Sequence, residues 1–226
     1  DRSRVVIGTA NEGEDVILYI SPDRPLGKVD ARTPPGGSAP HSPAQEVTFE
    51  LQHSGTSYPL NDVCFVDAQH GWAVGGGGED HRDYVLLRTV DGGRTWESLT
   101  TSLAYQLDSV FFLTPRLGWV SGYRGVILRT TDGGNSWTRL ASGSTYKLAQ
   151  IQFVDERSGF VVQAAHTHFM RTTDGGDSWT HHAIGISNDL LEISFVDARN
   201  GWAIGNKSLL AHTTDGGDTW HAVDYG

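Results

Sequence analysis

The 226 residues carry 17 Lys and Arg against 27 Asp and Glu, and the resulting formal charge of −10 disfavours a long phosphate-binding surface and therefore a nucleic-acid partner. The longest uninterrupted apolar run, 16–20, is far shorter than the roughly 20 residues that cross a bilayer, so no membrane insertion is expected. The single cysteine, Cys64, excludes an internal disulfide and a multi-cysteine metal centre.

We interpret the first 51 residues as one incomplete repeat unit. Strand-like stretches at 5–8 and 16–20 lead to a turn at Asp23, and another such stretch follows at 47–51. Residues 24–46 between them hold five of the eight prolines, together with Gly, Ser and Ala. Because this composition does not favour a packed core, we expect a mobile Pro/Gly-rich insertion at 24–46 within one domain spanning 1–226.

Four further units follow, each marked by an Asp-Gly-Gly turn and a tryptophan. Their aspartates lie 41, 42 and 41 residues apart, and a Gly-Trp or Gly-Phe pair precedes each turn. The aspartates and tryptophans of these boxes are Asp91, Trp96, Asp132, Trp137, Asp174, Trp179, Asp215 and Trp220. Self-similarity with a period in the low forties is typical of solenoids, arrays and propellers.

Each unit divides into four short segments of strand-like composition. In the second complete unit we expect strands at 109–113, 119–122, 126–131 and 136–140. The connections are too short for crossover helices, so the strands should pair antiparallel. Four such strands per repeat predict an all-β fold, a β-propeller of four-stranded blades. About five blades are visible and the first is incomplete, so the chain is either a five-unit ring or part of a larger propeller.

We interpret the box residues as structural. An Asp carboxylate accepts hydrogen bonds from residues just ahead of it, and the glycines supply the positive φ angles of the turn. The tryptophan is expected to bury its indole between neighbouring sheets. The boxes lack the several converging oxygens that calcium needs, and His166 and His168 have no third partner for a metal. We therefore expect no metal and no cofactor.

The run Gly71–Gly75, Gly-Trp-Ala-Val-Gly, and the run Val126–Trp137, which ends in Thr-Thr-Asp-Gly-Gly-Asn-Ser-Trp, carry a family resemblance. The box resembles the Asp-box, or bacterial neuraminidase (BNR) repeat. The fuller pattern resembles the photosystem II stability/assembly factor-like family of β-propellers, over about 47–226 and weakly over 1–23. The resemblance implies an extracytoplasmic protein, whether periplasmic, lumenal or secreted. We expect no signal peptide within the chain.

A candidate binding surface lies on the rim formed by the second-to-third-strand loops and the blade connections. A Tyr or Asn recurs before each inner strand, carboxylates follow closely, and the loops differ most between units. The candidate residues are Tyr58, Tyr105, Tyr146, Asn188, Asp62, Asp108, Glu192, Arg82, Tyr123 and Arg124. Aromatic faces beside carboxylates suit a cationic peptide or a sugar. The competing interpretation is that each tyrosine packs on the next blade.

These features predict a non-catalytic, assembly-factor-like scaffold that binds a protein partner. The alternative is a glycan-binding or sialidase-like propeller, because Asp-box propellers also include glycosidases. A sialidase needs convergent arginines, whereas Arg88, Arg129 and Arg171 recur once per box and are expected on outer strands away from the channel. We therefore expect no enzymatic activity and no catalytic residue.

Overall fold

The computed structural model describes residues 5–9, 15–19, 52–77, 81–101, 105–164, 167–185 and 190–223. The expected insertion at 24–46, the candidate Asn188 and His166 lie outside these ranges. Within them every element is a β-strand except one short 3-10 turn, η1 (Tyr123–Gly125). No helix in the described part of the chain is long and apolar enough to cross a membrane.

Four antiparallel four-stranded sheets, which we call blades A to D, follow one another along the chain. Blade A contains β3 (Leu60–Phe65), β4 (Gly71–Gly77), β5 (Asp83–Thr89) and β6 (Glu97–Ser98). Blade B contains β7 (Leu107–Phe112), β8 (Gly118–Gly122), β9 (Ile127–Thr130) and β10 (Thr138–Arg139). Blade C contains β11 (Leu148–Phe153), β12 (Gly159–Gln163), β13 (His168–Thr172) and β14 (Thr180–Ala183). Blade D contains β15 (Leu190–Phe195), β16 (Gly201–Gly205), β17 (Leu209–Thr213) and β18 (His221–Ala222).

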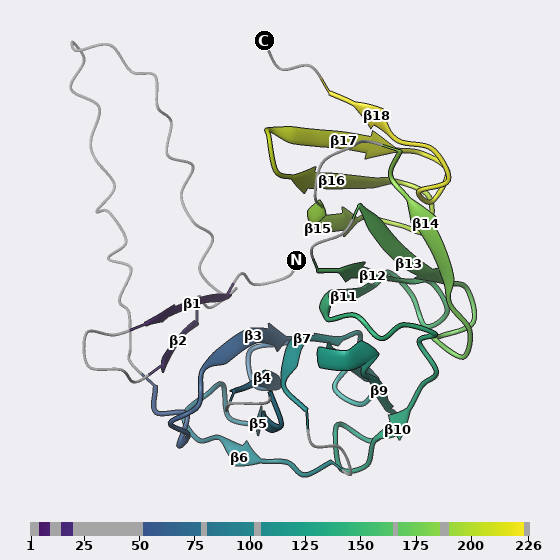
Figure 1. Ribbon diagram of the computed structural model, residues 1–226. Coiled ribbons are helices and arrows are strands. Elements are labelled where there is room, and N and C mark those ends of the chain that lie inside the picture. Colours follow the sequence, from purple (N-terminus) through teal and green to yellow (C-terminus); the bar gives the residue numbers. More distant parts are fainter. Residues whose placement is uncertain are drawn as a thin grey trace, which may run out of the picture.

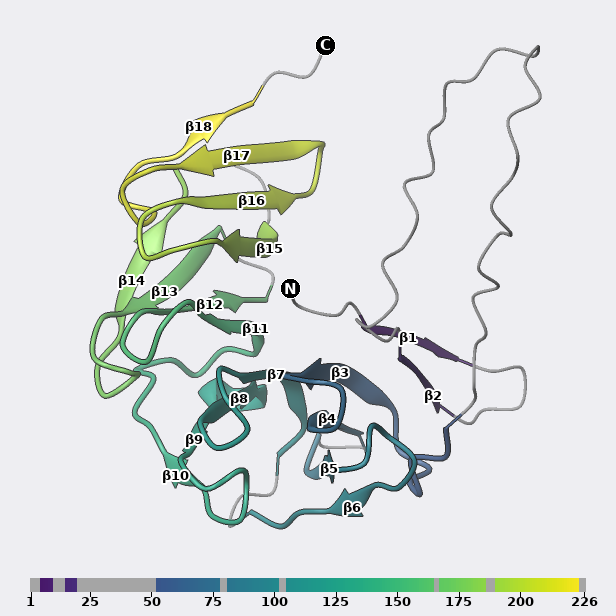
Figure 2. The ribbon, with the colours of Figure 1, turned by 180° about the vertical axis from the view of Figure 1, so that it is seen from behind.

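The blades stand side by side in an arc, with the first strand of each blade on the inside and the fourth on the outside (Figures 1 and 2). A separate hairpin of β1 (Val5–Thr9) and β2 (Asp15–Tyr19) lies beside β3. Its strands coincide with the stretches expected at 5–8 and 16–20. The expected all-β propeller of four-stranded antiparallel blades is therefore confirmed for the four blades that the structure describes.

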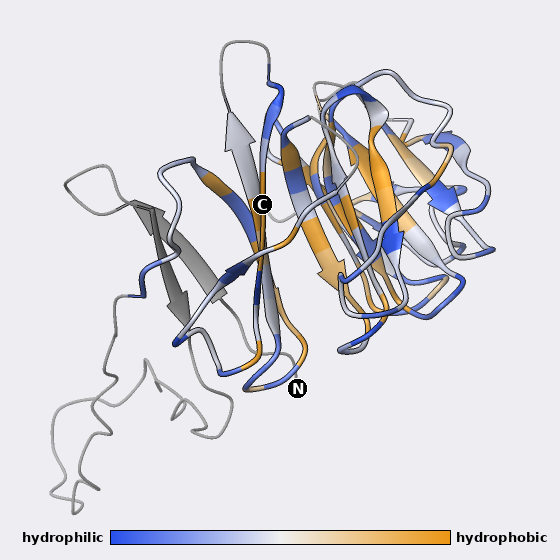
Figure 3. Ribbon diagram, turned by 90° about the horizontal axis from the view of Figure 1, so that it is seen from below, coloured by the Kyte–Doolittle hydropathy of each residue, from blue (hydrophilic) through white to orange (hydrophobic). Residues whose placement is uncertain are grey.

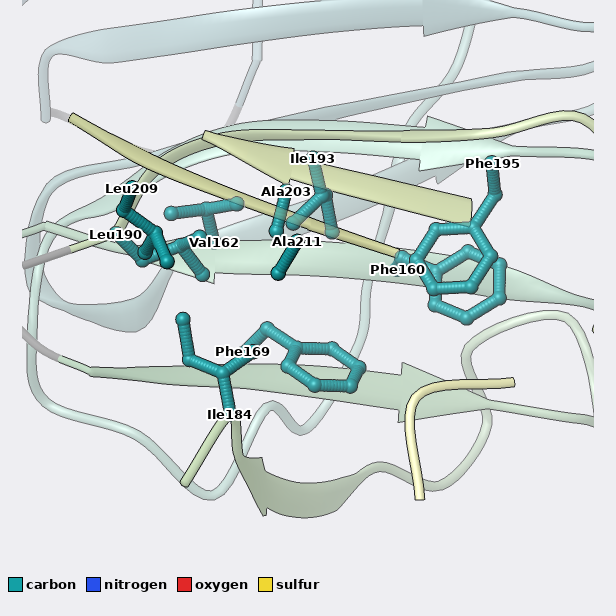
Figure 4. Packing of buried hydrophobic residues seen from close by; sticks show 10 residues of the cluster. All are labelled: Phe160, Val162, Phe169, Ile184, Leu190, Ile193, Phe195, Ala203, Leu209 and Ala211. Atoms are coloured by element: carbon teal, nitrogen blue, oxygen red, sulfur yellow. The ribbon is translucent and has the colours of Figure 1, made fainter. Parts of the chain in front are cut away.

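Stacked aromatic rings join each blade to the next. Trp72 of β4 lies flat against Phe112 of β7, with ring centroids 3.5 Å apart, and Trp119 of β8 stacks in the same way on Phe153 of β11 at 3.6 Å. Phe160 of β12 and Phe195 of β15 form the third stack, visible in Figure 4. Both members of such a pair leave water together, so the stack contributes apolar burial as well as ring geometry.

The glycine before each second-strand aromatic makes room for these rings. Gly118 pairs with Phe112 across the inner hairpin of blade B. A Cβ at Gly118 would lie 2.5 Å from the Phe112 ring, closer than atoms can approach. The equivalent glycines face Phe65, Phe153 and Phe195 in the same way. In each Gly-Trp or Gly-Phe pair, the glycine is therefore needed because an inner-strand phenylalanine packs directly against its backbone.

The box tryptophans occupy a different position from the stacked ones. Trp137 meets Phe112 of its own blade edge-on, at 6.1 Å and 90°, and it is only partly buried, whereas Trp72 and Trp119 are fully enclosed. Trp96, Trp179 and Trp220 repeat this edge-on contact with the inner-strand phenylalanine. The flat stacks between sheets are therefore made by the second-strand rings, whereas the box tryptophans pack partly buried against the same clusters.

Each Asp box is closed by the same set of hydrogen bonds. In blade B, Asp132 accepts from the Ser136 amide (2.9 Å) and the Ser136 hydroxyl (2.6 Å), and the Gly134 amide donates to the Thr130 hydroxyl. Gly133 and Gly134 hold φ angles of 77° and 95°, which residues with a side chain rarely adopt.

Figure 3 shows hydrophilic residues gathered at the loops and hydrophobic residues along the strands.

Hydrogen bonds from the box hydroxyl and amide groups lower the pKa of Asp91, Asp132 and Asp174 to about 2, and that of Asp215 is lowered by the same cause. A lowered carboxyl pKa stabilises the fold above the unfolded value of about 4, and this stabilisation is lost as the pH falls through the folded value. We expect the free energy of unfolding to decline between about pH 4 and pH 2. Urea titrations followed by circular dichroism at several pH values check this, and a flat profile in that window would contradict it.

Replacing Trp119 by Ala should cost about 3–5 kcal/mol of unfolding free energy, because the indole is fully buried and stacked across the boundary between blades B and C. Val90→Ala serves as the control, since Val90 is 56% exposed, and it should change stability by less than about 0.5 kcal/mol. Equal costs in urea denaturation would show that the stack does not stabilise the fold.

Candidate functional site

The inner strands of the four blades line an open hollow of about 490 Å³. Its polar lining includes the three candidate carboxylates from the sequence and several neutral side chains. These residues are Asn61, Asp62, Asp108, Ser109, Gln150, Gln152, Glu192 and Ser194. The structure therefore brings the predicted carboxylates to one cavity, and their bonding decides what each can do there.

Asp62 is half-buried and bonds to the neighbouring blade. Its Oδ2 accepts from the Ser109 hydroxyl (2.7 Å) and the Val110 amide (2.9 Å) of β7, and its Oδ1 accepts from the Val63 amide. Burial raises the pKa of Asp62, although these hydrogen bonds oppose the shift. This carboxylate holds two blades together and has little capacity left for a ligand.

The residues equivalent to Asp62 in blades B and C, Ser109 and Gln150, also bond to the inner strand of the following blade. The Ser109 hydroxyl accepts from the Ile151 amide at 3.2 Å. The Gln150 side-chain amide both donates to the Ile193 carbonyl and accepts from the Ile193 amide, each at 2.9 Å. Gln152 bonds to Phe195 in the same paired manner. The floor of the hollow is therefore a series of bonds between blades.

Asp108 is a buried acid held by a cation. The residue is only 7% exposed, and its Oδ1 accepts from Lys147 Nζ (2.7 Å) and from Gln106 Nε2 (2.9 Å). Its Oδ2 has no hydrogen-bond partner in the described part of the chain. Glu192 differs from both aspartates because it is exposed, on the inner strand of blade D.

Above the hollow, the loops of blades A and B interlock at the rim. The Gln106 amide donates to the His81 carbonyl (2.9 Å), and the Tyr123 amide donates to the Gln106 carbonyl (3.0 Å). His81 Nδ1 lies 2.7 Å from Gln106 Oε1, and the imidazole packs on the Tyr123 ring at 4.6 Å. Gln106 is the centre of this arrangement, since it also reaches Asp108.

Arg124 completes a group that we call the rim cluster. Its guanidinium lies over the Tyr105 ring, 5.7 Å from the centroid, and the residue is exposed. Arg124 and His81 both hold left-handed backbone, with φ of 57° and 52°. The rim cluster consists of His81, Tyr105, Gln106, Tyr123, Arg124 and Lys147. Non-glycine residues in this region are strained, and such strain collects at functional sites.

The remaining candidates lie around this cluster. Arg82 is exposed next to His81. Tyr146 precedes Lys147, its carbonyl accepts from the Gly125 amide at 2.7 Å, and the residue is 53% exposed. Tyr58 occupies the equivalent place before β3 and is 41% exposed. The tyrosines at 58 and 146 therefore leave much of their rings in solvent.

The charge of the rim differs from what the sequence suggested. The acids that should make the entrance acidic, Asp62 and Asp108, are engaged by Ser109, Val110, Lys147 and Gln106. The exposed charge beside the aromatic rings is instead that of Arg124, over the Tyr105 ring. The rim cluster therefore offers cations and aromatic faces, which suit an acidic or carboxylate-bearing ligand better than a cationic one.

Sequence reasoning missed three members of the rim cluster. Gln106 and Lys147 each directly follow a recurring tyrosine, so comparing the residues after Tyr58, Tyr105 and Tyr146 would have drawn attention to them. His81 lies in the long loop of blade A, where no repeat could align it. Within the described ranges, no group of three or more His, Cys, Asp and Glu side chains could hold a metal.

Replacing Asp62 by Ala should cost about 1–3 kcal/mol, because the Ser109 hydroxyl and two backbone amides lose their acceptor. The matched control is Glu192→Ala, the same strand position on an exposed edge, expected within about 0.5 kcal/mol of the parent. Urea denaturation of the two variants measures the difference. Equal stability of both would mean that Asp62 does not couple blades A and B.

Comparison with known proteins finds one family. The family model described as photosynthesis system II assembly factor YCF48 matches residues 41–145 and 143–226. A photosystem II stability/assembly factor HCF136, chloroplastic, from Cyanidioschyzon merolae is 33% identical over 37% of this chain and 18% of its own length. A photosystem II assembly lipoprotein Ycf48 from Nostoc is 34% identical over 40% of this chain and 25% of its own length. The matched segment is thus at most a quarter of either relative.

Among solved structures, a GH74 enzyme from Niastella koreensis superimposes with a TM-score of 0.60 at 16% identity. The match covers 98% of this chain and 36% of that enzyme. At this identity the likeness establishes the propeller fold alone.

Proposed function

The chain belongs to the photosynthesis system II assembly factor YCF48 family, and on this basis we propose that it is a non-catalytic β-propeller scaffold that binds a polypeptide partner through the rim cluster. One relative is named a photosystem II stability/assembly factor and another a photosystem II assembly lipoprotein. We extend that role to this chain. We also propose that 1–226 forms one propeller domain, with 24–46 as its Pro/Gly-rich insertion.

The observation that carries the proposal is Arg124. This exposed guanidinium lies over the Tyr105 ring, 5.7 Å from its centroid, and the residue holds left-handed backbone at φ 57°, a conformation that is enriched at functional sites. Arginine and tyrosine are the residues that most often dominate protein interfaces. Arg124 is the exposed charged side chain of the rim cluster beside an aromatic ring, so the segment bound should be acidic or carry a free carboxylate.

We further propose that the protein acts outside the cytoplasm, in a periplasm, a lumen or the medium. Support comes from the relatives, one named a lipoprotein and the other chloroplastic.

Glycan binding is the second candidate, and one observation favours it. Tyr58 and Tyr146 expose 41% and 53% of their surface on the same rim, and exposed aromatic faces stack on sugars. In this candidate Tyr58 and Tyr146 would carry the affinity, whereas in the polypeptide candidate Arg124 and Tyr105 carry it.

The two candidates separate in a binding experiment with matched variants. Arg124→Gly keeps the left-handed backbone and removes only the side chain, so it should leave the melting temperature unchanged. It should weaken the binding of a polypeptide captured and purified with the parent protein by about tenfold or more. Arg116→Ala, an exposed arginine in the first-to-second-strand loop of blade B, is the control and should bind as the parent does. Affinity should also fall as salt rises.

Equal affinity of the parent and Arg124→Gly for every captured polypeptide would overturn the proposal. Binding on a glycan array that disappears in Tyr58→Ala and Tyr146→Ala, but persists in Arg124→Gly, would establish the second candidate instead.

A further inference from the structure

The boundary between blades C and D departs from the repeat at its outer edge. In blades A and B, Leu99 and Leu140 each follow the box tryptophan by three residues. A Cβ added to the second glycine of the next box, Gly134 or Gly176, would lie 2.8 Å from the leucine, so leucine and box are in direct contact. In blade C this position holds His182. A titratable side chain therefore replaces an aliphatic one at this boundary.

Phe169 makes the contact with the box of blade D in place of the leucine. Its ring is fully buried in the hydrophobic cluster shared by blades C and D (Figure 4), and it faces Gly217, the second glycine of that box. Trp220 meets the ring edge-on at 5.9 Å. His182 stacks on the same ring, with centroids 5.3 Å apart and planes inclined by 24°. The imidazole is therefore part of the packing that joins the two blades.

Polar groups from both blades surround this imidazole. Its Nε2 lies 2.8 Å from the Thr180 hydroxyl, and its Nδ1 lies 3.4 Å from Asp218 Oδ1 in the box of blade D. Arg171 Nη1 contacts the same carboxylate oxygen at 3.2 Å. The titratable and charged groups that face His182 are Arg171 on β13, Asp218 in the box and His181 on its own strand.

Protonation of His182 is unfavourable in these surroundings. Burial lowers the pKa of His182 and the Arg171 guanidinium lowers it further, whereas Asp218 opposes the shift. The Asp218 side chain is 54% exposed, so water screens its attraction. A histidine with a lowered pKa stabilises the fold above its unfolded value of about 6.5, and this stabilisation is lost as the pH falls from there through the folded value.

The inner edge of the same boundary is held by neutral groups. Gln150 and Gln152 bond through their side-chain amides to the backbone of Ile193 and Phe195, each at 2.9 Å. Phe160 stacks on Phe195 at 3.6 Å. None of these groups changes charge in mild acid, so the inner contacts persist where the outer one weakens.

We propose that the boundary between blades C and D is a pH-sensitive joint: in mild acid, protonation of His182 loosens the outer edge, where Phe169 meets the box of blade D, while the inner edge stays in place. The boundaries that hold Leu99 and Leu140 do not respond. This inference does not depend on the proposed function, because it uses neither the rim nor a ligand.

Hydrogen–deuterium exchange at about pH 7.5 and about pH 5.5 tests the joint, with rates expressed as protection factors so that the intrinsic effect of pH cancels. Segment 213–220 reports on the box of blade D, whose Gly216, Gly217 and Thr219 amides are hydrogen-bonded. Its protection should fall by about threefold or more at the lower pH, whereas that of 132–136 in blade B should not change.

Two variants assign this response to one side chain. His182→Leu, which restores the residue of blades A and B, should abolish the difference between the two pH values. His181→Gln is the matched control, because His181 is the exposed neighbour on the same strand, and it should respond as the parent does. Equal protection of 213–220 in the parent at both pH values would overturn the proposal, and so would an undiminished response in His182→Leu.

Should His182→Leu not fold, an NMR titration of the parent decides. The pKa of the His182 imidazole must be lower in the folded chain than in the chain unfolded in urea. An equal or higher value in the folded chain would also overturn the proposal.

Discussion

The contact on which the rest of this structure depends is the flat stack of a second-strand ring on the inner-strand phenylalanine of the next blade. It sets the distance between blades near the first-to-second-strand turns, where Trp72–Phe112, Trp119–Phe153 and Phe160–Phe195 lie 3.5 to 3.6 Å apart. An isolated sheet would leave both of its faces in water, so a blade is stable only through its neighbours. The glycine before each ring is the local condition for this contact.

The stack has consequences for the inner hollow and the rim. With blades held this close, a side chain on one inner strand reaches the backbone of the next, and Asp62, Ser109 and Gln150 all do so. These bonds engage Asp62, Ser109 and Gln150, and we propose that recognition falls to the loops above the hollow. There the exposed Arg124 guanidinium lies over the Tyr105 ring, although the protein as a whole carries a formal charge of −10. A local surface can therefore have the opposite sign to the whole chain.

The sequence predicted the repeat, the strand order and the type of fold, because periodic glycines, tryptophans and β-branched runs are local signals. Strand β10 begins at Thr138 rather than at the expected 136, since the Ser136 hydroxyl and amide are bound to Asp132. The sequence could not tell which tryptophans are fully enclosed, because both sets recur with the same period. It also could not reveal that Asp62 and Asp108 are bonded to a neighbouring blade or to Lys147, because spacing carries no information on these contacts.

The central claim is that the loop rim of blades A and B is the surface that holds a polypeptide. Hydrogen–deuterium exchange of the chain with and without its isolated polypeptide partner tests this most directly, since it maps every segment at once. The account requires added protection at 81–84, 105–108, 123–125 and 146–147, and none at the Asp boxes on the opposite rim. Protection confined to the boxes, at 91–95 and 132–136, would contradict it.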